Sequence, residues 1–280
     1  MAPSTNFWKT QQKESDRTLG LETEEECRKR WISIRIIYFN GFLVYLAFSI
    51  IGTSVWPYLN SVDPDAGKVF LTYVFAIPSL MQLVCSPLFG WWNNKLSSIR
   101  MPMALFLILF IIGQIMYSTV EEFPVHRKYV MLTARALVGI SSVCCTIYRA
   151  YVSSATTVAE RTMTMSILSL AQTLGILAGS VFQSLFAIFG EEGYRVLGLF
   201  RLNMYTASGW FCAVLGVVNL VLMLPSIFQD QLIAVKEAMK GLGVTDKKDV
   251  YKTLELQHLA ILLMLVAFAL LMFVYSGYQT

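Results

Sequence analysis

A row of polar residues at helical spacing is the part of this sequence best suited to chemistry. Its members, separated by four, three, four and three positions, are Arg135, Gly139, Ser142, Thr146 and Arg149. This spacing places them on one face of an α-helix, along about 21 Å of its axis. A guanidinium among Leu, Val, Ile and Cys is costly inside a membrane, so it should face a bundle interior or water. The row therefore predicts a solute path; for Arg149, an anchor that reaches the membrane surface is the alternative.

Seven apolar stretches must position this row. They approach or exceed the roughly 20 residues that an α-helix needs to span a bilayer, and they cover residues 36–57, 69–92, 101–118, 129–152, 164–190, 204–227 and 259–277. The composition agrees, with 56% hydrophobic and 14% charged residues. A soluble fold cannot bury so much continuous apolar length. We therefore predict an all-α, polytopic membrane protein that is embedded in the lipid bilayer.

The charged residues divide this chain into segments. Sixteen Lys and Arg residues lie on the side of the N-terminus and five on the other side, which predicts a cytosolic N-terminus. Because the charges are sorted by side, the net charge of +4 is no sign of nucleic-acid binding. The predicted segments are a basic cytosolic tail (1–35), a six-helix transmembrane bundle (36–227), a charged cytosolic linker (228–258) and a seventh transmembrane helix (259–280). Within the linker, Gln231–Lys240 is expected to form an amphipathic helix on the membrane surface.

The absence of Asp and Glu from the seven stretches bears on the ligand. Proton-coupled transport usually depends on membrane-buried carboxylates. A buried arginine without a carboxylate partner favours a ligand that supplies the negative charge. We therefore expect a small-molecule or inorganic anion as substrate. In the first stretch, Asn40 and Tyr45 are expected to line the same path, although aromatic and small residues at their spacing are also typical of helix packing.

Two further patterns concern helix packing and hinges. Small residues recur every four positions in the fifth stretch, at Ala171, Gly175 and Gly179, and let another helix approach closely. Between the second and third stretches, a glycine at a predicted helix end is followed by polar and basic residues, which suits a cytosolic hinge or gating loop. The residues of this loop are Gly90, Asn94, Lys95 and Arg100.

Several classes of function are disfavoured by the sequence. Four of the five cysteines fall inside spans and none forms a pair in opposing non-cytosolic loops, so a disulfide framework is not expected. The two histidines, His126 and His258, have no metal-ligand spacing around them. No phosphate-cradling glycine loop occurs either. We expect no enzyme activity, no metal and no cofactor.

These motifs resemble those of the major facilitator superfamily. Gly90 to Lys95 is similar to the family signature G-x-x-x-D/N-R/K-x-G-R/K, with Ser97 in place of the later Gly. The segment from Arg135 to Ser141 is similar to R-x-x-x-G-x-G, and that from Gly175 to Ser180 is similar to G-x-x-x-G-P without its Pro. Further stretches resemble an endolysosomal group of this family, including Arg30-Trp-x-Ser-Ile-Arg35, Ser54-x-Trp-Pro-Tyr-Leu59 and Ala159-Glu-Arg161-Thr.

The resemblance implies the six-helix N-terminal half of a twelve-span, alternating-access transporter, with spans one and four lining the path. It also implies a lysosomal or endosomal membrane, and chloride as one candidate solute. A tyrosine-based sorting pattern, Tyr251-Lys-Thr-Leu254, fits that location. An isolated half is expected to self-associate or to require the missing C-terminal half.

Three other hypotheses are an anion channel, a truncated non-transporting form and a seven-helix receptor. The channel hypothesis assigns selectivity to Arg135. The receptor is disfavoured by the basic N-terminus and the absence of a loop disulfide.

Overall fold

A computed structural model of the protein describes residues 21–95, 98–124, 126–190, 193–196, 200–230, 232–243, 262–264 and 266–267. The six predicted spans of the bundle are confirmed as helices long and apolar enough to cross a membrane. They are α2 (Glu24–Val62), α3 (Gly67–Lys95), α4 (Arg100–Ser118), α5 with α6 (Arg127–Ser141 and Val143–Ser154), α7 (Val158–Phe186) and α8 (Met204–Leu222). The protein is thus an all-α, multi-pass membrane protein. Most of the seventh predicted span lies outside the described residues.

Short elements complete the chain. The 3₁₀-helices η1 (Pro64–Ala66), η2 (Val120–Glu122) and η3 (Ala187–Phe189) follow α2, α4 and α7. Strands β1 (Tyr194–Val196) and β2 (Phe200–Leu202) pair antiparallel, with Arg195 opposite Arg201. Helix α9 (Ala234–Leu242) overlaps the predicted amphipathic segment Gln231–Lys240 and belongs to a second compact unit, which begins at Val235.

Helix α2 begins earlier than its apolar span, which starts at residue 36. The Thr23 hydroxyl accepts a hydrogen bond from the Glu26 N–H, and the Glu26 carboxylate accepts one from the Thr23 N–H. This capping box satisfies two free donors at the helix start, and three acidic residues in the first turn favour the positive end of the helix dipole. Residues 24–35 of the predicted tail are therefore helical.

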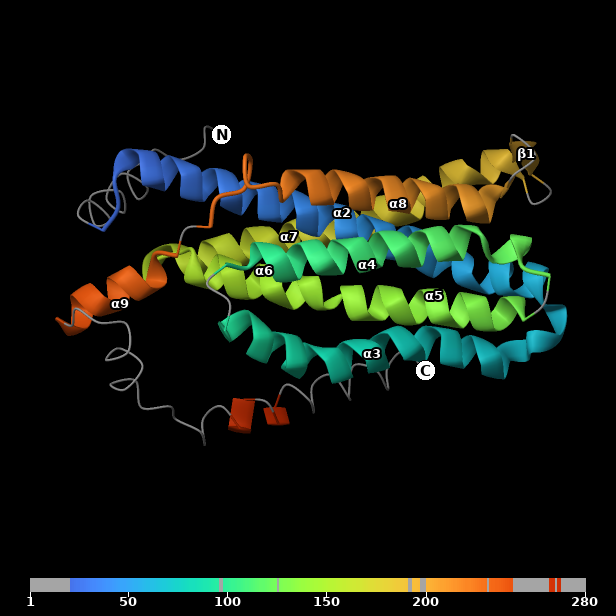
Figure 1. The fold of residues 1–280 in the computed structure, drawn as a ribbon, viewed down its shortest axis with the longest axis horizontal. Helices are drawn as coiled ribbons and strands as arrows, with labels where there is room; N and C mark the ends of the chain where they lie inside the picture. Colours follow the sequence, from blue (N-terminus) through green and yellow to red (C-terminus); the bar gives the residue numbers. More distant parts are fainter. Residues whose placement is uncertain are drawn as a thin grey trace, which may run out of the picture. The chain divides into compact units, whose positions relative to one another are not determined.

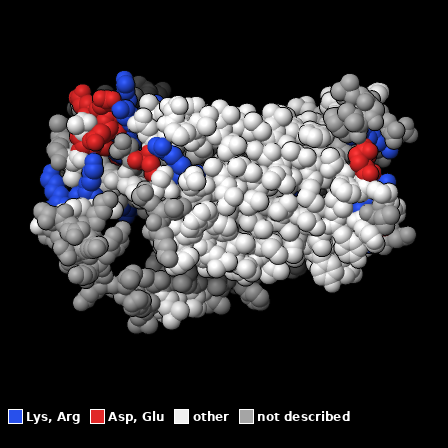
Figure 2. Space-filling model, viewed as in Figure 1, with Lys and Arg blue, Asp and Glu red and all other residues white. Residues whose placement is uncertain are grey.

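The helices of the first unit lie alongside one another, with α2 packed along α7 and α8, and α5 packed between α3 and α4 (Figure 1). Two clusters of buried apolar side chains fill the space between them. On the face shown in Figure 2, the charged residues lie towards the two ends of the helices and the band between them shows none. This distribution suits a bilayer, because charge is costly in its hydrocarbon core.

The contact between α2 and α7 depends on two glycines. A Cβ atom at Gly175 would lie 2.5 Å from the Phe42 carbonyl oxygen, and one at Gly179 would lie 2.6 Å from the Leu46 carbonyl oxygen. The Ser49 hydroxyl of α2 donates to the Ile176 carbonyl of α7 over 2.7 Å. Small residues therefore bring the two backbones together, the role that the sequence predicted for this row. Ala171, in the same row, is half-buried.

At the end of the bundle where α2 begins, Arg30 joins two parts of the chain. Its side chain is fully buried, and its guanidinium lies 2.7 Å from the Glu22 carboxylate and 3.0 Å from the Glu160 carboxylate. It also donates to the Ala155 carbonyl over 3.1 Å. Since Glu160 completes the capping box that starts α7, Arg30 ties the start of α2 to the connection between α6 and α7.

The first residues of the predicted linker 228–258 also belong to this end. The Ser33 hydroxyl donates to the Gln229 carbonyl over 2.8 Å and accepts from the Gln229 N–H over 3.1 Å. The Asp230 carboxylate accepts from the Ile99 N–H at the start of α4. Phe228 is fully buried beside Tyr151. The chain after α8 is thus fixed to α2, α4 and α6 before the second unit begins.

The α2–α7 contact predicts different costs for two Gly→Ala changes. Gly179→Ala should lower the free energy of unfolding by about 1–3 kcal/mol, because its Cβ would meet backbone. The matched control Gly52→Ala lies in α2, where a Cβ meets nothing within 4 Å, so it should be neutral or slightly stabilising. Thermal unfolding of the full chain in detergent micelles measures both. Equal losses of stability would contradict this close approach.

The Arg30 cluster predicts that Arg30→Met lowers the free energy of unfolding by about 3–5 kcal/mol, because two buried carboxylates lose their partner. Glu25→Gln removes the exposed ion pair of Glu25 with Lys29 and one first-turn charge, so it should lower the free energy of unfolding by no more than about 1 kcal/mol. The same unfolding measurement applies, and an unchanged Arg30→Met protein would show that the cluster is dispensable.

Candidate functional site

The candidate site is a cavity of about 410 Å³ between α2, α3, α5, α6 and α7. Its lining combines apolar surface with a few polar side chains, as ligand sites usually do. The polar residues that line it are Tyr45, Ser49, Ser79, Gln82, Arg135, Ser142 and Cys145. None of the described residues that line it is acidic.

Arg135 is the only charged residue among the described lining residues. Its side chain is 7% exposed, and among the described residues its Nε and Nη1 atoms have no hydrogen-bond partner. A buried cation without a counter-charge or acceptors is strongly disfavoured in a medium of low dielectric constant. The arrangement therefore suits an anionic ligand that enters the cavity and accepts from the guanidinium.

A local break in the fourth span lies beside this arginine. Helices α5 and α6 meet at Ser142, and the hydroxyls of Ser141 and Ser142 donate to the Val138 and Gly139 carbonyls over 2.7 and 2.6 Å. Side-chain donation to carbonyls of the preceding turn competes with helix hydrogen bonds and bends helices. The break leaves Ser142 in the cavity lining, where its hydroxyl oxygen can still accept.

The predicted row divides into three roles. Arg135 and Ser142 line the cavity, whereas Thr146 and Arg149 are exposed further along α6. The Arg149 guanidinium donates to the Gln172 side chain of α7 over 3.0 Å. Gly139 does not line the cavity: a Cβ there would meet the Pro78 backbone, with the carbonyl oxygen at 2.5 Å. Gly139 is thus the point where α3 approaches α5, and we assign it to packing.

Of the two path residues predicted in the first span, Tyr45 belongs to the described cavity lining and Asn40 does not. Tyr45 lines the cavity. Asn40 is fully buried in α2 away from the described lining, and neither its Nδ2 nor its Oδ1 atom has a partner among the described residues. Asn40 is therefore a polar residue of the helix interface and not a lining residue.

The predicted gating loop begins later than expected. Gly90 lies inside α3, which continues to Lys95, so it does not end the helix. Asn94 and Lys95 form part of the last turn, and their side chains lie outside the described residues. Arg100 starts α4, with its guanidinium 6.0 Å from the centre of the Phe228 ring. Arg100 thus contacts the segment that follows α8.

Sequence reasoning missed several polar residues of the cavity lining, among them Ser79, Gln82 and Cys145. Ser79 and Gln82 of α3 are three positions apart on one helix face, and both line it. Their spacing was a usable signal, since Gln82 is an isolated amide in an apolar span. Cys145 lines it as well. Because Cys144 and Cys145 are adjacent, the sequence alone could not show which of the two faces the cavity.

The comparison with known families agrees with this architecture. The family described as Major Facilitator Superfamily matches residues 37–280. This chain belongs to the major facilitator superfamily. It is 34% identical over 264 residues to the protein named major facilitator superfamily domain-containing protein 8 of Xenopus laevis. The match covers 93% of this chain and 52% of that protein, so the chain spans about half the length of this relative.

The cavity predicts selective reactivity of one native thiol. Two chains should be prepared, one with Cys145 and one with Cys212 as the sole cysteine. Cys145 lines the same cavity as Arg135, whereas Cys212 is fully buried and its thiol approaches the Ala47 carbonyl of α2. An anionic methanethiosulfonate should modify Cys145 at least about tenfold faster, because access and positive charge promote thiolate reactions.

A charge control identifies the role of Arg135 in this labelling. Arg135→Gln should slow the anionic reagent at Cys145 but leave a neutral maleimide unaffected. Equal labelling of Cys145 and Cys212 by the anionic reagent would show that the cavity is closed to solutes.

Proposed function

We propose that this chain transports a small anionic solute across an endolysosomal membrane as part of an alternating-access carrier. The observation that carries the proposal is the buried guanidinium of Arg135, which lines a cavity of about 410 Å³ and has two nitrogens without a partner among the described residues. Membership of the major facilitator superfamily supports transport as the class of function.

The chemistry of the cavity supports an anion over other solutes. A cation would be repelled by Arg135, and none of the described lining residues supplies a carboxylate to neutralise it. A neutral polar solute would leave the arginine uncompensated. An anion satisfies both the charge and the guanidinium donors that have no partner among the described residues, and the Ser79 hydroxyl lies in the same lining.

The exposed residues of α6 support a path that continues beyond the cavity. Thr146 and Arg149 lie one and two helical turns past Ser142, towards the end where α2 begins. Arg149 keeps a single described hydrogen bond, to Gln172. A second cation at this distance would attract an anion that moves along the helix. Self-association, or completion by a second half, would enclose the exposed side of this path.

A lysosomal chloride or anion channel is the second candidate. It is favoured by the absence of acidic residues from the described lining, because coupled carriers commonly use a carboxylate that loads and unloads a proton. A cytosolic N-terminus, in agreement with the Lys and Arg bias, is part of both proposals. The sorting pattern at Tyr251 lies outside the described residues.

Removal of the charge tests the proposal. The 280-residue chain is reconstituted in liposomes that hold a chloride-sensitive dye. Arg135→Gln should reduce chloride flux by about tenfold to a hundredfold, since a hydrogen bond to a charged group contributes about 1.5–3 kcal/mol. Arg135→Lys should retain part of it. The control Arg28→Gln, exposed near the start of α2, should match the unmodified chain.

Two results would contradict the proposal. Wild-type flux in Arg135→Gln would exclude Arg135 from the path, and a selective loss of cation flux would assign the opposite charge to the solute. Single-channel recording separates the two candidates, because a carrier saturates and gives no unitary currents. An unmodified chain without flux would favour a non-transporting role.

A further inference from the structure

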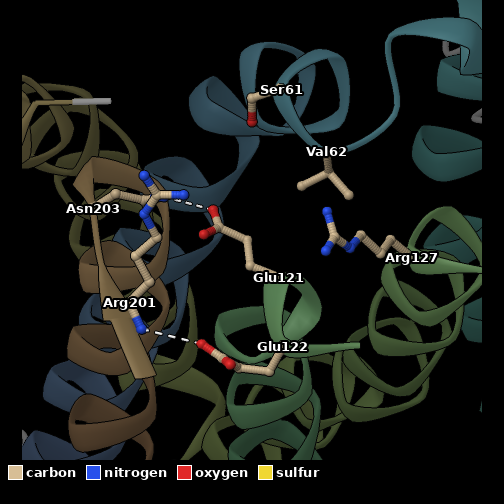
Figure 3. A pocket seen from close by; sticks show the side chains of 7 residues that line it. All are labelled: Ser61, Val62, Glu121, Glu122, Arg127, Arg201 and Asn203. Carbon is tan, nitrogen blue, oxygen red and sulfur yellow. Dashed lines mark hydrogen bonds between the residues drawn. The ribbon is translucent and has the colours of Figure 1, made fainter. Parts of the chain in front are cut away.

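A second cavity, of about 230 Å³, lies at the opposite end of the bundle from the start of α2. It forms where α2 ends, where η2 follows α4, and where α5 and α8 begin. The residues that line it are Ser61, Val62, Glu121, Glu122, Arg127, Arg201 and Asn203. The side chains of Glu121 and Arg127 face one another across it (Figure 3). The proposed transport path does not use them. Among the described residues that line this cavity, Val62 is the only apolar one.

Each of the two glutamate carboxylates is held through its Oε1 atom. Asn203 accepts from the Tyr205 and Thr206 N–H groups at the start of α8, and its Nδ2 donates to the Oε1 atom of Glu121. The Oε1 atom of Glu122 accepts from the Arg201 N–H over 3.2 Å. Each glutamate is thus oriented by a neighbour, and its second oxygen has no described hydrogen bond.

Arg127 is oriented in a similar way from the other side. Its Nε atom donates to the Phe123 carbonyl over 2.8 Å. The two terminal nitrogens then point towards the opening, opposite Glu121 (Figure 3). No ion pair within 4.0 Å joins Arg127 to either glutamate among the described residues. Opposite charges therefore face one another across a cavity without contact.

We propose that this cavity binds a polar zwitterion of amino-acid size, with its carboxylate on Arg127 and its ammonium group on Glu121 and Glu122. A guanidinium pairs well with a carboxylate in a bidentate geometry. A simple anion would approach two glutamates, and a simple cation would approach Arg127, so a ligand that carries both charges suits this cavity best. The volume is below the range of roughly 300–1,000 Å³ for drug-sized ligands, which suits a small molecule. The cavity is separate from Arg135 and the proposed anion path.

Three matched probes test the charge requirement. L-Glutamine carries both charged groups, 5-amino-5-oxopentanoate lacks the ammonium group, and 4-aminobutanamide lacks the carboxylate. Binding to the full chain in nanodiscs is measured by equilibrium dialysis of the radiolabelled compounds. L-Glutamine should bind at least about tenfold more tightly than either partner compound, since each loses a charge-assisted hydrogen bond. Equal binding of all three, or no saturable binding of L-glutamine, would overturn the proposal.

Substitutions of the lining residues test whether L-glutamine binds in this cavity. Arg127→Gln and the Glu121→Gln/Glu122→Gln double variant should each weaken L-glutamine binding by about tenfold or more. Arg127→Lys keeps the charge and should retain measurable binding, which separates loss of the site from loss of the fold. Lys128→Gln is the matched control, because Lys128 pairs with Asp63 and does not line the cavity. It should bind normally, and so should Arg135→Gln.

The Arg135→Gln variant separates this proposal from the proposed transport function. Loss of L-glutamine binding in Arg135→Gln but not in Arg127→Gln would place the zwitterion in the central cavity and overturn the second site. Unchanged chloride flux in Arg135→Gln would contradict the transport path alone.

Discussion

The cost of holding a guanidinium in a medium of low dielectric constant governs this structure. The bundle holds two buried arginines, Arg30 and Arg135, in different surroundings. Arg30 is fully buried and receives two carboxylates and a carbonyl, so its charge is neutralised within the fold. Arg135 is almost as buried, but among the described residues it has no acidic neighbour in the lining and no partner for two of its nitrogens. The first arrangement stabilises a fold, whereas the second is stable only in contact with water or a ligand.

Close backbone contacts give the bundle its geometry. Glycines at 175 and 179 bring α7 against α2, and Gly139 brings α5 against α3. At these glycines a helix meets the backbone of its neighbour, which fits a membrane protein, since helix association in lipid gains little from the hydrophobic effect. The helices that line the cavity include α2, α3, α5 and α7. These helices are held in place by the two glycine contacts, in which a helix meets the backbone of its neighbour.

The sequence predicted the six spans well because apolar length alone determines them. It placed the start of α2 too late, since the capping box at Thr23 precedes the apolar run. Helical periodicity grouped Gly139 with Arg135, but a periodic pattern cannot show whether a face meets a cavity or another helix. The sequence analysis gave Arg30 no ion-pair partner, because Glu160, whose carboxylate pairs with it, is distant in the sequence. Gln82 was missed although it lies three positions from Ser79 in an apolar span, a spacing that places both on one helix face.

The contact of Gly139 with Pro78 has a mechanical consequence. Main chain meets main chain there, with no compressible side-chain layer between the two helices. Pro78 itself borders the cavity, and Arg135 lies one turn away on α5. Any tilt of α3 about this contact would move Ser79 and Gln82 relative to Arg135, so the width of the cavity and the polar groups that face its charge would change together.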